Sequence, residues 1–497
     1  MKTVFVLFDS LNRLALSPWG GSIKTPNFKR FSESSITFNT HYVGSLPCMP
    51  ARRDLHTGRI NFLHRSWGPL EPFDHSFPEI LKLNGYYSHL ITDHYHYWED
   101  GGATYHNRYS SWDFMRGQEW DPWKALVNPP KDKFTKNYHP LQSDINDRKR
   151  LQGMINREFI SDEKDYSMVK CIKKGIDFLE INHSSDNWFL QLECFDPHEP
   201  FFAPERFRDL YPTGYNGPVL NWPKYQKVLE SENEVEEIRA NYAALISMCD
   251  EYFGKILDYF DKKNLWKDTA LIVTTDHGFM LAEHGWWAKS RMPFYEEISH
   301  IPLMIYHPNF KEFSGYSRNN LTQTIDIMPT ILEFYDIEIP ENVEGCSLIP
   351  VIKEEKNIRH AALFGRFGAA TNITDGRYTY FRYPKDMKKE KLWEYTLMPT
   401  HQTSLFDLEE FENASLSHSF AFMRGFPVLK LPAGKSKNKG QGSKIEETNT
   451  VLYDLKKDPK QLKPMIDYKI ENYLINLMKN LMERNEAPKE AFDRLDL

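Results

Sequence analysis

The sequence has little of what marks several large classes of protein. Only five of its 497 residues are cysteine, and they are scattered without metal-finger spacing, which argues against a disulfide framework and fits a reducing compartment. No apolar run approaches the ~18 residues that a membrane-spanning helix requires. The opening residues are too short and too quickly acidic for a signal peptide. Together these features predict a cytoplasmic protein that does not enter a membrane.

The chain also lacks an excess of basic charge. Its formal net charge is −7 at pH 7, and no block of lysine and arginine dominates, so nucleic acid is not an expected partner. An anionic substrate would have to be held by local cations, because the field of the whole protein does not attract it. A length of 497 residues exceeds what one ordinary core supports, which predicts two domains.

Two apolar runs end directly in polar residues. Residues 3–8 end at Asp9, and residues 270–275 run into Asp276 and His277. Continuous apolar runs of this length predict buried parallel strands, and ligands bind at the carboxyl ends of such strands in open α/β sheets. We therefore expect Asp9, Asp276 and His277 to lie on one rim of a sheet. For Asp9 alone, a helix cap or a turn is an equally good interpretation.

Histidines follow two further predicted strands. Residues 188–195 precede a segment with proline at 197 and 200, and these prolines fix an extended loop that presents His198. A shorter predicted strand at 88–92 leads to His94 and His96. An imidazole can donate a hydrogen bond to an anion, but its charge depends on pH. The alternative interpretation of His94 and His96 is that they lie on the surface.

Cys48 lies in the most informative stretch, which reads C-x-P-x-R from Cys48 to Arg52 and then T-G-R at 57–59. Residues 51–57 predict a helix that Gly58 ends. Cys48 would lie just before the N-terminus of that helix, where free N–H groups favour an anion. Arg52, one turn along, can point back at the same anion. Taken alone, a cysteine here is more often a buried structural residue.

The pattern C-x-P-x-R followed by T-G-R resembles the signature of type I sulfatases, which are formylglycine-dependent enzymes of the alkaline phosphatase superfamily. In that family the cysteine is oxidised after translation to formylglycine, whose hydrated aldehyde is the nucleophile. The resemblance therefore implies a formylglycine made from Cys48 by a formylglycine-generating, sulfatase-maturing enzyme. It extends from Asp9 to Pro459 through D-H-G at 276–278, P-H-x-P at 197–200 and E-H-G…K…Y-E-E…P-L at 283–303.

The resemblance also implies roles for the residues that match. Arg52 and Lys289 would neutralise the sulfuryl oxygens, and His198 would protonate the leaving alcohol. His96 matches a histidine that contacts the formylglycine and the sulfate, and it would help to collapse the intermediate. His94 stands where the family usually has a substrate-binding lysine. An isolated Lys289 would be interpreted as a solvated surface charge.

A metal site is implied by the same resemblance. Its ligands would be Asp9, Asp276, His277 and the oxygen derived from Cys48, and Ser10 replaces the second aspartate that usually ends the first strand. Oxygen-rich sites suit hard cations, so one divalent metal is expected, with Ca²⁺ favoured. The imidazole keeps Mn²⁺ and Zn²⁺ as alternatives.

The expected fold is α/β, with a large mixed, mostly parallel sheet sandwiched by helices as in alkaline phosphatase. A smaller C-terminal α+β domain would carry a short antiparallel sheet. We predict a catalytic domain at 1–355 and the smaller domain at 356–497. Residues 100–165 lack clear periodicity and predict an irregular insert, either a functional lid or assembly surface or a plain insertion. Residues 435–444 are rich in lysine, glycine and serine and predict a loop.

The predicted function is that of a sulfate-ester hydrolase that releases inorganic sulfate from a sulfated sugar or an aryl or alkyl sulfate. The nearest alternative is a phosphonate monoester or phosphodiester hydrolase of the same superfamily, in which the first strand also departs from Asp-Asp. The retained candidate residues argue against a third alternative, an inactive relative that binds anionic glycans. The sequence does not define the alcohol part of the substrate and is compatible with an oligomer.

Overall fold

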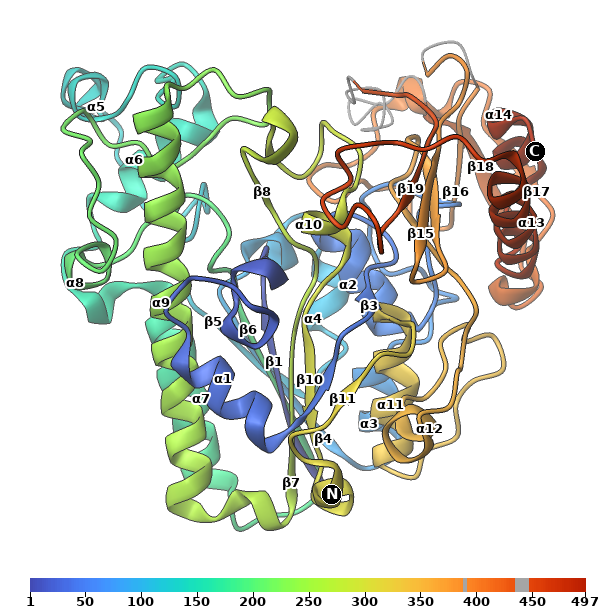
Figure 1. Ribbon diagram of the computed structural model, residues 1–497, viewed down its shortest axis with the longest axis horizontal. Coiled ribbons are helices and arrows are strands. Elements are labelled where there is room, and N and C mark those ends of the chain that lie inside the picture. Colours follow the sequence, from blue (N-terminus) through green and yellow to red (C-terminus); the bar gives the residue numbers. More distant parts are fainter. Residues whose placement is uncertain (388–390, 434–446) are drawn as a thin grey trace.

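The computed structural model describes residues 1–387, 391–433 and 447–497, so the loop predicted at 435–444 lies outside the described residues. An eight-stranded mixed sheet forms the centre of the molecule, in the order β11-β2-β10-β7-β1-β6-β4-β5 (Figure 1). Its strands are β1 (Lys2–Phe8), β2 (Ile36–Phe38), β4 (Tyr87–Thr92), β5 (Ser111–Phe114), β6 (Trp188–Cys194), β7 (Thr269–Thr275), β10 (Leu303–Tyr306) and β11 (Ser317–Arg318). The neighbouring strands β7, β1, β6, β4 and β5 run parallel to one another. Strand β10 is antiparallel to both of its neighbours, β2 and β7. The mostly parallel sheet that the sequence predicts is confirmed.

Both faces of the sheet are covered by helices. One face packs against α1 (Pro26–Ser34), α7 (Ser167–Asn182) and α9 (Glu232–Lys263). The other face packs against α2 (Cys48–Thr57), α3 (Phe77–Leu83), α11 (Ile327–Phe334) and α12 (Ile349–Glu354). Figure 1 shows these two layers on either side of the strands. This is the sandwich that the sequence predicts.

The central strand β1 is apolar from Val4 to Phe8 because both of its faces are buried. Val4, Val6 and Phe8 belong to the hydrophobic cluster on one face, and Phe5 and Leu7 belong to the cluster on the other. Because successive side chains point to opposite faces, a strand that is buried on both sides carries apolar residues at successive positions. Polar residues, Asp9 and Ser10, follow this apolar run directly where the strand ends.

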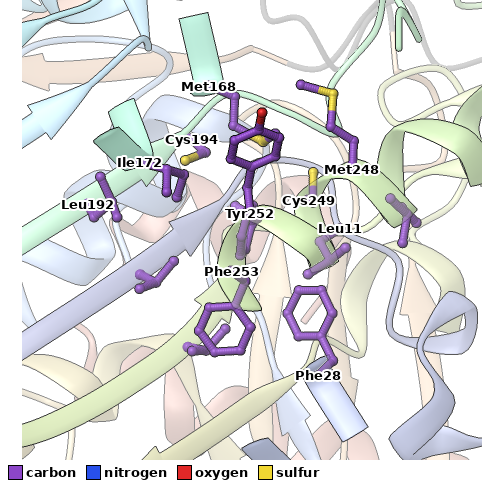
Figure 2. Close-up of a cluster of buried hydrophobic side chains, with 14 of the residues drawn as sticks. Leu11, Phe28, Met168, Ile172, Leu192, Cys194, Met248, Cys249, Tyr252 and Phe253 are labelled. Atoms are coloured by element: carbon purple, nitrogen blue, oxygen red, sulfur yellow. The ribbon is translucent and has the colours of Figure 1, made fainter. Parts of the chain in front are cut away.

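The first of these clusters joins α1, α7 and α9 to the sheet. Figure 2 shows Phe28 from α1, Ile172 from α7 and Phe253 from α9 together in it. The rings of Phe28 and Phe253 stack with their centroids 5.2 Å apart. This packing holds the long helix α9 along the sheet and fixes the strands whose ends carry the candidate residues.

The C-terminal part of the chain contains antiparallel sheets. One consists of β13 (Ala362–Gly365), β14 (Thr371–Thr374), β15 (Tyr378–Arg382) and β19 (Val451–Asp454), and a second of β16 (Trp393–Thr396), β18 (Val428–Pro432) and β17 (Ser415–Ser417). Side chains of α13 (Tyr468–Arg484) and α14 (Lys489–Leu495) pack with the first sheet against Ile60 and Phe62. The small antiparallel sheet is confirmed, whereas the division of the chain at residue 355 stays a prediction.

Residues 100–165 are more regular than their sequence suggests. They contain α4 (Ala103–His106), α5 (Lys131–Asn137), α6 (Arg148–Arg157) and β5, which pairs in parallel with β4 at the edge of the main sheet. The prediction of an irregular insert is wrong for these elements. Strand β5 has four residues, all partly or fully exposed, and so few positions give no readable periodicity.

The remaining elements are short. They are β3 (His41–Tyr42), α8 (Glu205–Arg208), β8 (Met280–Leu281), β9 (Trp287–Ala288), α10 (Glu296–Ser299) and β12 (Thr322–Gln323). Among the described residues, none of the helices combines the length and the apolar character that crossing a membrane requires. The cytoplasmic location stays a prediction.

Candidate active site

Adjacent parallel strands bring the candidate residues to one rim of the main sheet. Strand β1 lies between β6 and β7, with Phe8 paired with Cys194 on one side and Thr275 on the other. Asp9 therefore emerges beside Asp276 and beside the loop that carries His198. Strand β4 lies on the far side of β6 and leads to His94 and His96.

Helix α2 brings Cys48 to the same rim. The helix begins at Cys48, three residues earlier than the sequence predicts, and every one of its residues is buried. It ends at Gly58, whose positive φ of 64° suits glycine and whose N–H donates to the carbonyl of Asp54. Asp54 in turn accepts from Asn61 Nδ2 and from Ser45 Oγ, which fixes the approach to the helix.

Four of the candidate residues form a compact set of donors. One ligand atom from each of Asp9, Cys48, Asp276 and His277 lies within 4.8 Å of every other, and all four residues are buried. His277 Nδ1 lies 2.9 Å from the carbonyl of Gly278, so it carries the proton and leaves Nε2 as the ligand atom. That Nε2 is 3.2 Å from Cys48 Sγ. Two carboxylates, an imidazole nitrogen and an adjacent position 48 fit a divalent cation.

Arg52 ties these carboxylates together. Its guanidinium donates to Asp9 at 2.9 Å, to Asp276 at 2.6 Å and to Glu193 at 2.7 Å, and it is fully buried. Burial lowers the pKa of Arg52, but Glu193, Asp276 and Asp9 outweigh burial and hold it well above its usual value. Burial likewise raises the pKa of Asp9, yet Lys289 and Arg52 hold it well below its usual range. Asp9 is therefore held in its ionised form.

Lys289 reaches the site through Ser10. Its Nζ donates to Ser10 Oγ at 2.7 Å and lies 3.7 Å from Asp9 Oδ1. Ser10 has a positive φ of 63°, and in this conformation its hydroxyl donates to Asp9 while its N–H donates to Asp276. Although burial opposes the charge, Cys48, Glu199 and Asp9 raise the pKa of Lys289 above its usual value. Ser10 therefore positions both aspartates, which is a role that the sequence did not reveal.

The three candidate histidines, which follow strands β4 and β6, surround the ring of Phe195. The Phe195 centroid lies 5.0 Å from that of His94, 6.5 Å from that of His96 and 4.2 Å from that of His198. His94 is completely buried, and neither of its ring nitrogens has a hydrogen-bond partner among the described residues. Its Nδ1 is 3.8 Å from Asp9 Oδ2. Burial, assisted by Arg52, holds the pKa of His94 well below its usual value, so this imidazole is neutral.

The other two histidines have their Nδ1 atoms engaged. His96 Nδ1 lies 2.5 Å from Glu99 Oε2. His198 Nδ1 lies 2.7 Å from the carbonyl oxygen of Glu199, and burial followed by the charge of Lys289 holds the pKa of His198 well below its usual value. In both rings Nε2 is the nitrogen that remains for substrate chemistry.

Several residues of this region match none of the sequence motifs that predict the site. Glu193 is the acidic position near the end of a buried and mostly apolar strand, and the strand pattern hides it. Glu199 occupies the variable position of P-H-x-P. Glu119 lies in the segment at 100–165, where no motif marks it. One ligand atom each from Glu119, His198 and Glu199 also lie within 4.8 Å of one another.

A cavity of about 680 Å³ lies beside this site rather than over Cys48. It lies between the segment at 100–165 and the loops that follow β6. Gln118, Glu119 and Pro200 belong to its wall, together with Arg157 and Trp222. The segment at 100–165 therefore reaches the surroundings of His198, where it can contact the alcohol part of a substrate.

An α/β sandwich with acidic, histidine and cysteine ligands on the rim of its sheet defines a hydrolase of the alkaline phosphatase type. Residues 2–337 match the family model for sulfatases, and residues 282–419 match that for the C-terminal part of N-sulphoglucosamine sulphohydrolase. The chain belongs to the sulfatase family. It is accordingly a sulfuric ester hydrolase, and its kinship with type I sulfatases is confirmed.

Several of the similar proteins are sulfatases of different kinds. The chain is 26% identical to an N-acetylglucosamine-6-O-sulfatase of Bacteroides thetaiotaomicron over 403 residues, covering 71% of each chain. It is 24% identical to a choline-sulfatase of Rhizobium meliloti over 436 residues, covering 81% of each. A solved structure in complex with D-glucosamine-2-N,6-O-disulfate superposes with a TM-score of 0.67 at 16% identity, covering 99% of both chains.

Phosphonate monoester hydrolases share the fold as well. The enzyme of Agrobacterium radiobacter superposes with a TM-score of 0.64 at 17% identity, covering 98% of this chain and 95% of that one. At such identities the structural likeness speaks for the fold alone.

Proposed function

We propose that this protein hydrolyses the sulfate ester of a sugar or another small alcohol, with a formylglycine made from Cys48 as its nucleophile. The observation that carries the proposal is the set Asp9, Cys48, Asp276 and His277, whose ligand atoms lie within 4.8 Å of one another. A maturing enzyme would convert Cys48 to formylglycine. This conversion would suit the metal site, because a thiol is a poor ligand for a hard cation and an oxygen at the same position is a good one.

The metal that fits this site best is Ca²⁺, with Mn²⁺ and Zn²⁺ as alternatives. Asp9 and Asp276 would supply carboxylate oxygens, and His277 would supply Nε2. A cation and a hydrated aldehyde bound here would supply a Lewis acid and an oxygen nucleophile. Arg52 donates to Oδ2 of both carboxylates, and this fixes their orientation before any substrate binds.

Three cationic or polar side chains would hold the sulfuryl group. Lys289 is charged and buried beside Ser10, so it can neutralise a sulfuryl oxygen in a water-poor site. His94 has two buried ring nitrogens without partners, and buried polar atoms of this kind are usually satisfied by a ligand. A sulfuryl oxygen of the substrate would satisfy one of them. Arg52 adds positive charge from its position beside the carboxylates of Asp9 and Asp276.

Two histidines are suited to proton transfer. His198 donates through Nδ1 to the Glu199 carbonyl, and the Glu199 carboxylate lies 3.2 Å away, where it can stabilise an imidazolium. His198 Nε2 can then deliver the proton to the leaving alcohol. His96, oriented by Glu99, would accept a proton when sulfate leaves.

The second candidate function is hydrolysis of a phosphonate monoester or a phosphodiester. It is favoured by Ser10, because this residue replaces a carboxylate that sulfatases usually have at the first strand. Matured enzyme should release sulfate from an aryl sulfate faster than it cleaves the aryl phosphodiester with the same phenol. A preference for the phosphodiester would move the assignment to the second candidate.

A further inference from the structure

A second cluster of buried acidic groups adjoins the reaction centre on the side of His198. Glu119 and Glu199 come from different loops, and one ligand atom of each lies within 4.8 Å of the other and of His198. Both residues are nearly inaccessible, at 3% and 1% exposed. Two carboxylates this close repel each other in a medium of low polarity unless a positive group lies between them.

The outer oxygens of the two carboxylates are already hydrogen-bonded. Tyr95 donates to Glu119 Oε2 at 2.8 Å, and Tyr225 donates to Glu199 Oε1 at 2.6 Å. Glu199 Oε2 has no hydrogen-bond partner among the described residues. It lies 3.2 Å from His198 Nδ1, but the proton of that nitrogen is directed to the Glu199 carbonyl at 2.7 Å. A buried carboxylate oxygen without a donor indicates that a ligand provides one.

The surroundings only partly relieve this pair. Burial, assisted by the charge of Glu199, raises the pKa of Glu119 well above its usual value, and burial also raises the pKa of Glu199, whereas Lys289 lowers both. A positively charged group that donates N–H bonds to both carboxyl groups would remove this cost, which a neutral hydroxyl group cannot do.

Cations of helix α6 lie close to the pair but bind elsewhere. Lys149 Nζ lies 4.4 Å from the ring centroid of Trp120, and the guanidinium of Arg150 lies 4.4 Å from that of Trp222. Arg150 also donates to the carbonyl oxygens of Trp222 and Pro223. Lys149 therefore places an alkylammonium group on an aromatic ring of this region.

We propose that Glu119 and Glu199 form a subsite for a primary ammonium group on the alcohol part of the ester. The favoured substrates are then sulfate esters of amino alcohols or of sugars with a free amine close to the ester oxygen. A primary ammonium has three N–H donors and can bond both carboxylates at once, which a quaternary ammonium cannot do. This inference rests on the proposed function, because the subsite takes its place from the leaving group that His198 protonates.

A matched pair of esters tests the subsite. In 2-aminoethyl sulfate and propyl sulfate, an ammonium group and a methyl group occupy the same position. Matured wild-type enzyme should show kcat/KM for the ammonium ester higher by about 10- to 100-fold, as expected for charged hydrogen bonds. Glu119→Gln should bring this ratio close to one while propyl sulfate is still hydrolysed. Glu236→Gln, an exposed carboxylate of α9, should leave the ratio unchanged.

Equal kcat/KM for the two esters in wild-type enzyme would overturn the subsite, and so would a ratio that survives both Glu119→Gln and Glu199→Gln. A second bound divalent metal that is lost in Glu119→Gln would overturn it as well, in favour of a metal site. If matured enzyme cleaves only an aryl phosphodiester, the proposed function fails instead. In that case, competition by 2-aminoethyl and propyl phosphate against the phosphodiester still measures the preference for ammonium.

Discussion

At the scale of single residues, the site separates the groups that hold the sulfuryl group from the group that serves the leaving alcohol. Lys289 is tied to Ser10 and Asp9 near the donor set, whereas His198 lies on the side of Glu119 and Glu199. The loss of rate that follows substitution of Lys289 should therefore depend on the leaving group differently from the loss that follows substitution of His198. This distinction can be measured without knowing the natural alcohol.

His198→Ala should slow the hydrolysis of an alkyl sulfate far more than that of an activated aryl sulfate, because a good leaving group needs little protonation. The difference should be ~100- to 10,000-fold, the usual size of general acid catalysis. Lys289→Ala should slow both esters by similar factors, since it acts on the sulfuryl group. The measurement is kcat/KM on both esters for both variants. Equal losses for His198→Ala would remove it from the acid role and make His96 the next residue to test.

Residues at the ends of apolar strands were within reach of sequence reasoning, and residues inside other patterns were not. Asp9, Asp276 and His277 each follow a strand that is buried on both faces, and parallel strands place such residues on one rim. Glu193 lies within a strand, so its burial next to Arg52 depends on a contact between distant segments. The position of Glu119 next to His198 depends on how the segment at 100–165 folds back toward the site, and no local sequence pattern encodes this.

At the scale of elements, helix α2 carries Cys48 and Arg52 into the site and is buried along its whole length. His56 lies in its last turn, with Nδ1 2.8 Å from Ser76 Oγ. Burial, with a smaller effect of Arg108, lowers the pKa of His56 to about 3. This histidine is therefore neutral in the folded protein down to low pH, whereas in the unfolded chain it gains a proton near pH 6.5.

The free energy of unfolding should consequently fall as pH drops from about 6.5 toward 3, because the unfolded state binds the extra proton. One such histidine contributes a slope of about 1.4 kcal/mol per pH unit in this window. His56→Asn should reduce the slope by about that amount, as measured by urea unfolding at several pH values. The exposed His360→Asn should leave it unchanged. An unaltered slope in His56→Asn would show that His56 does not titrate in this way.

Element boundaries were predicted well where periodicity was long and poorly where elements were short. The periodicity of residues 234–260 predicts a long helix, and α9 agrees closely with it. A capping box at Ser231 and Glu234 and a left-handed Asn264 enclose this amphipathic run. The sequence predicts that the helix begins at residue 51, whereas α2 begins at Cys48 and includes Pro50 in its first turn, where proline is tolerated. Strand β5 was missed because it is short and at an edge.

At the scale of the whole molecule, one divalent metal would join segments that are far apart in the sequence. Asp9 follows β1, Cys48 begins α2, and Asp276 and His277 follow β7. A ligand that binds only the folded state stabilises it by mass action, by about 2.7 kcal/mol at a hundred times its Kd. Metal binding should therefore affect both activity and unfolding.

Exhaustive chelation should abolish the release of sulfate and lower the Tm, and added Ca²⁺ should restore both more effectively than Mn²⁺ or Zn²⁺. The measurements are sulfate release and thermal unfolding on the same samples. Asp276→Asn should weaken the response of the Tm to metal, whereas Glu236→Gln should not. Full activity after chelation would contradict a metal role for these residues.

The central claim is that Cys48, once converted to formylglycine, is the nucleophile of a sulfate-ester hydrolase. The most direct measurement is the rate of sulfate release per enzyme, set against the fraction of Cys48 that peptide mass analysis finds as the aldehyde. We predict a rate proportional to that fraction, with protein made without a maturing enzyme nearly inactive and Cys48→Ala inactive but folded. Sulfate release that is independent of the converted fraction, or that persists in Cys48→Ala, would contradict the claim.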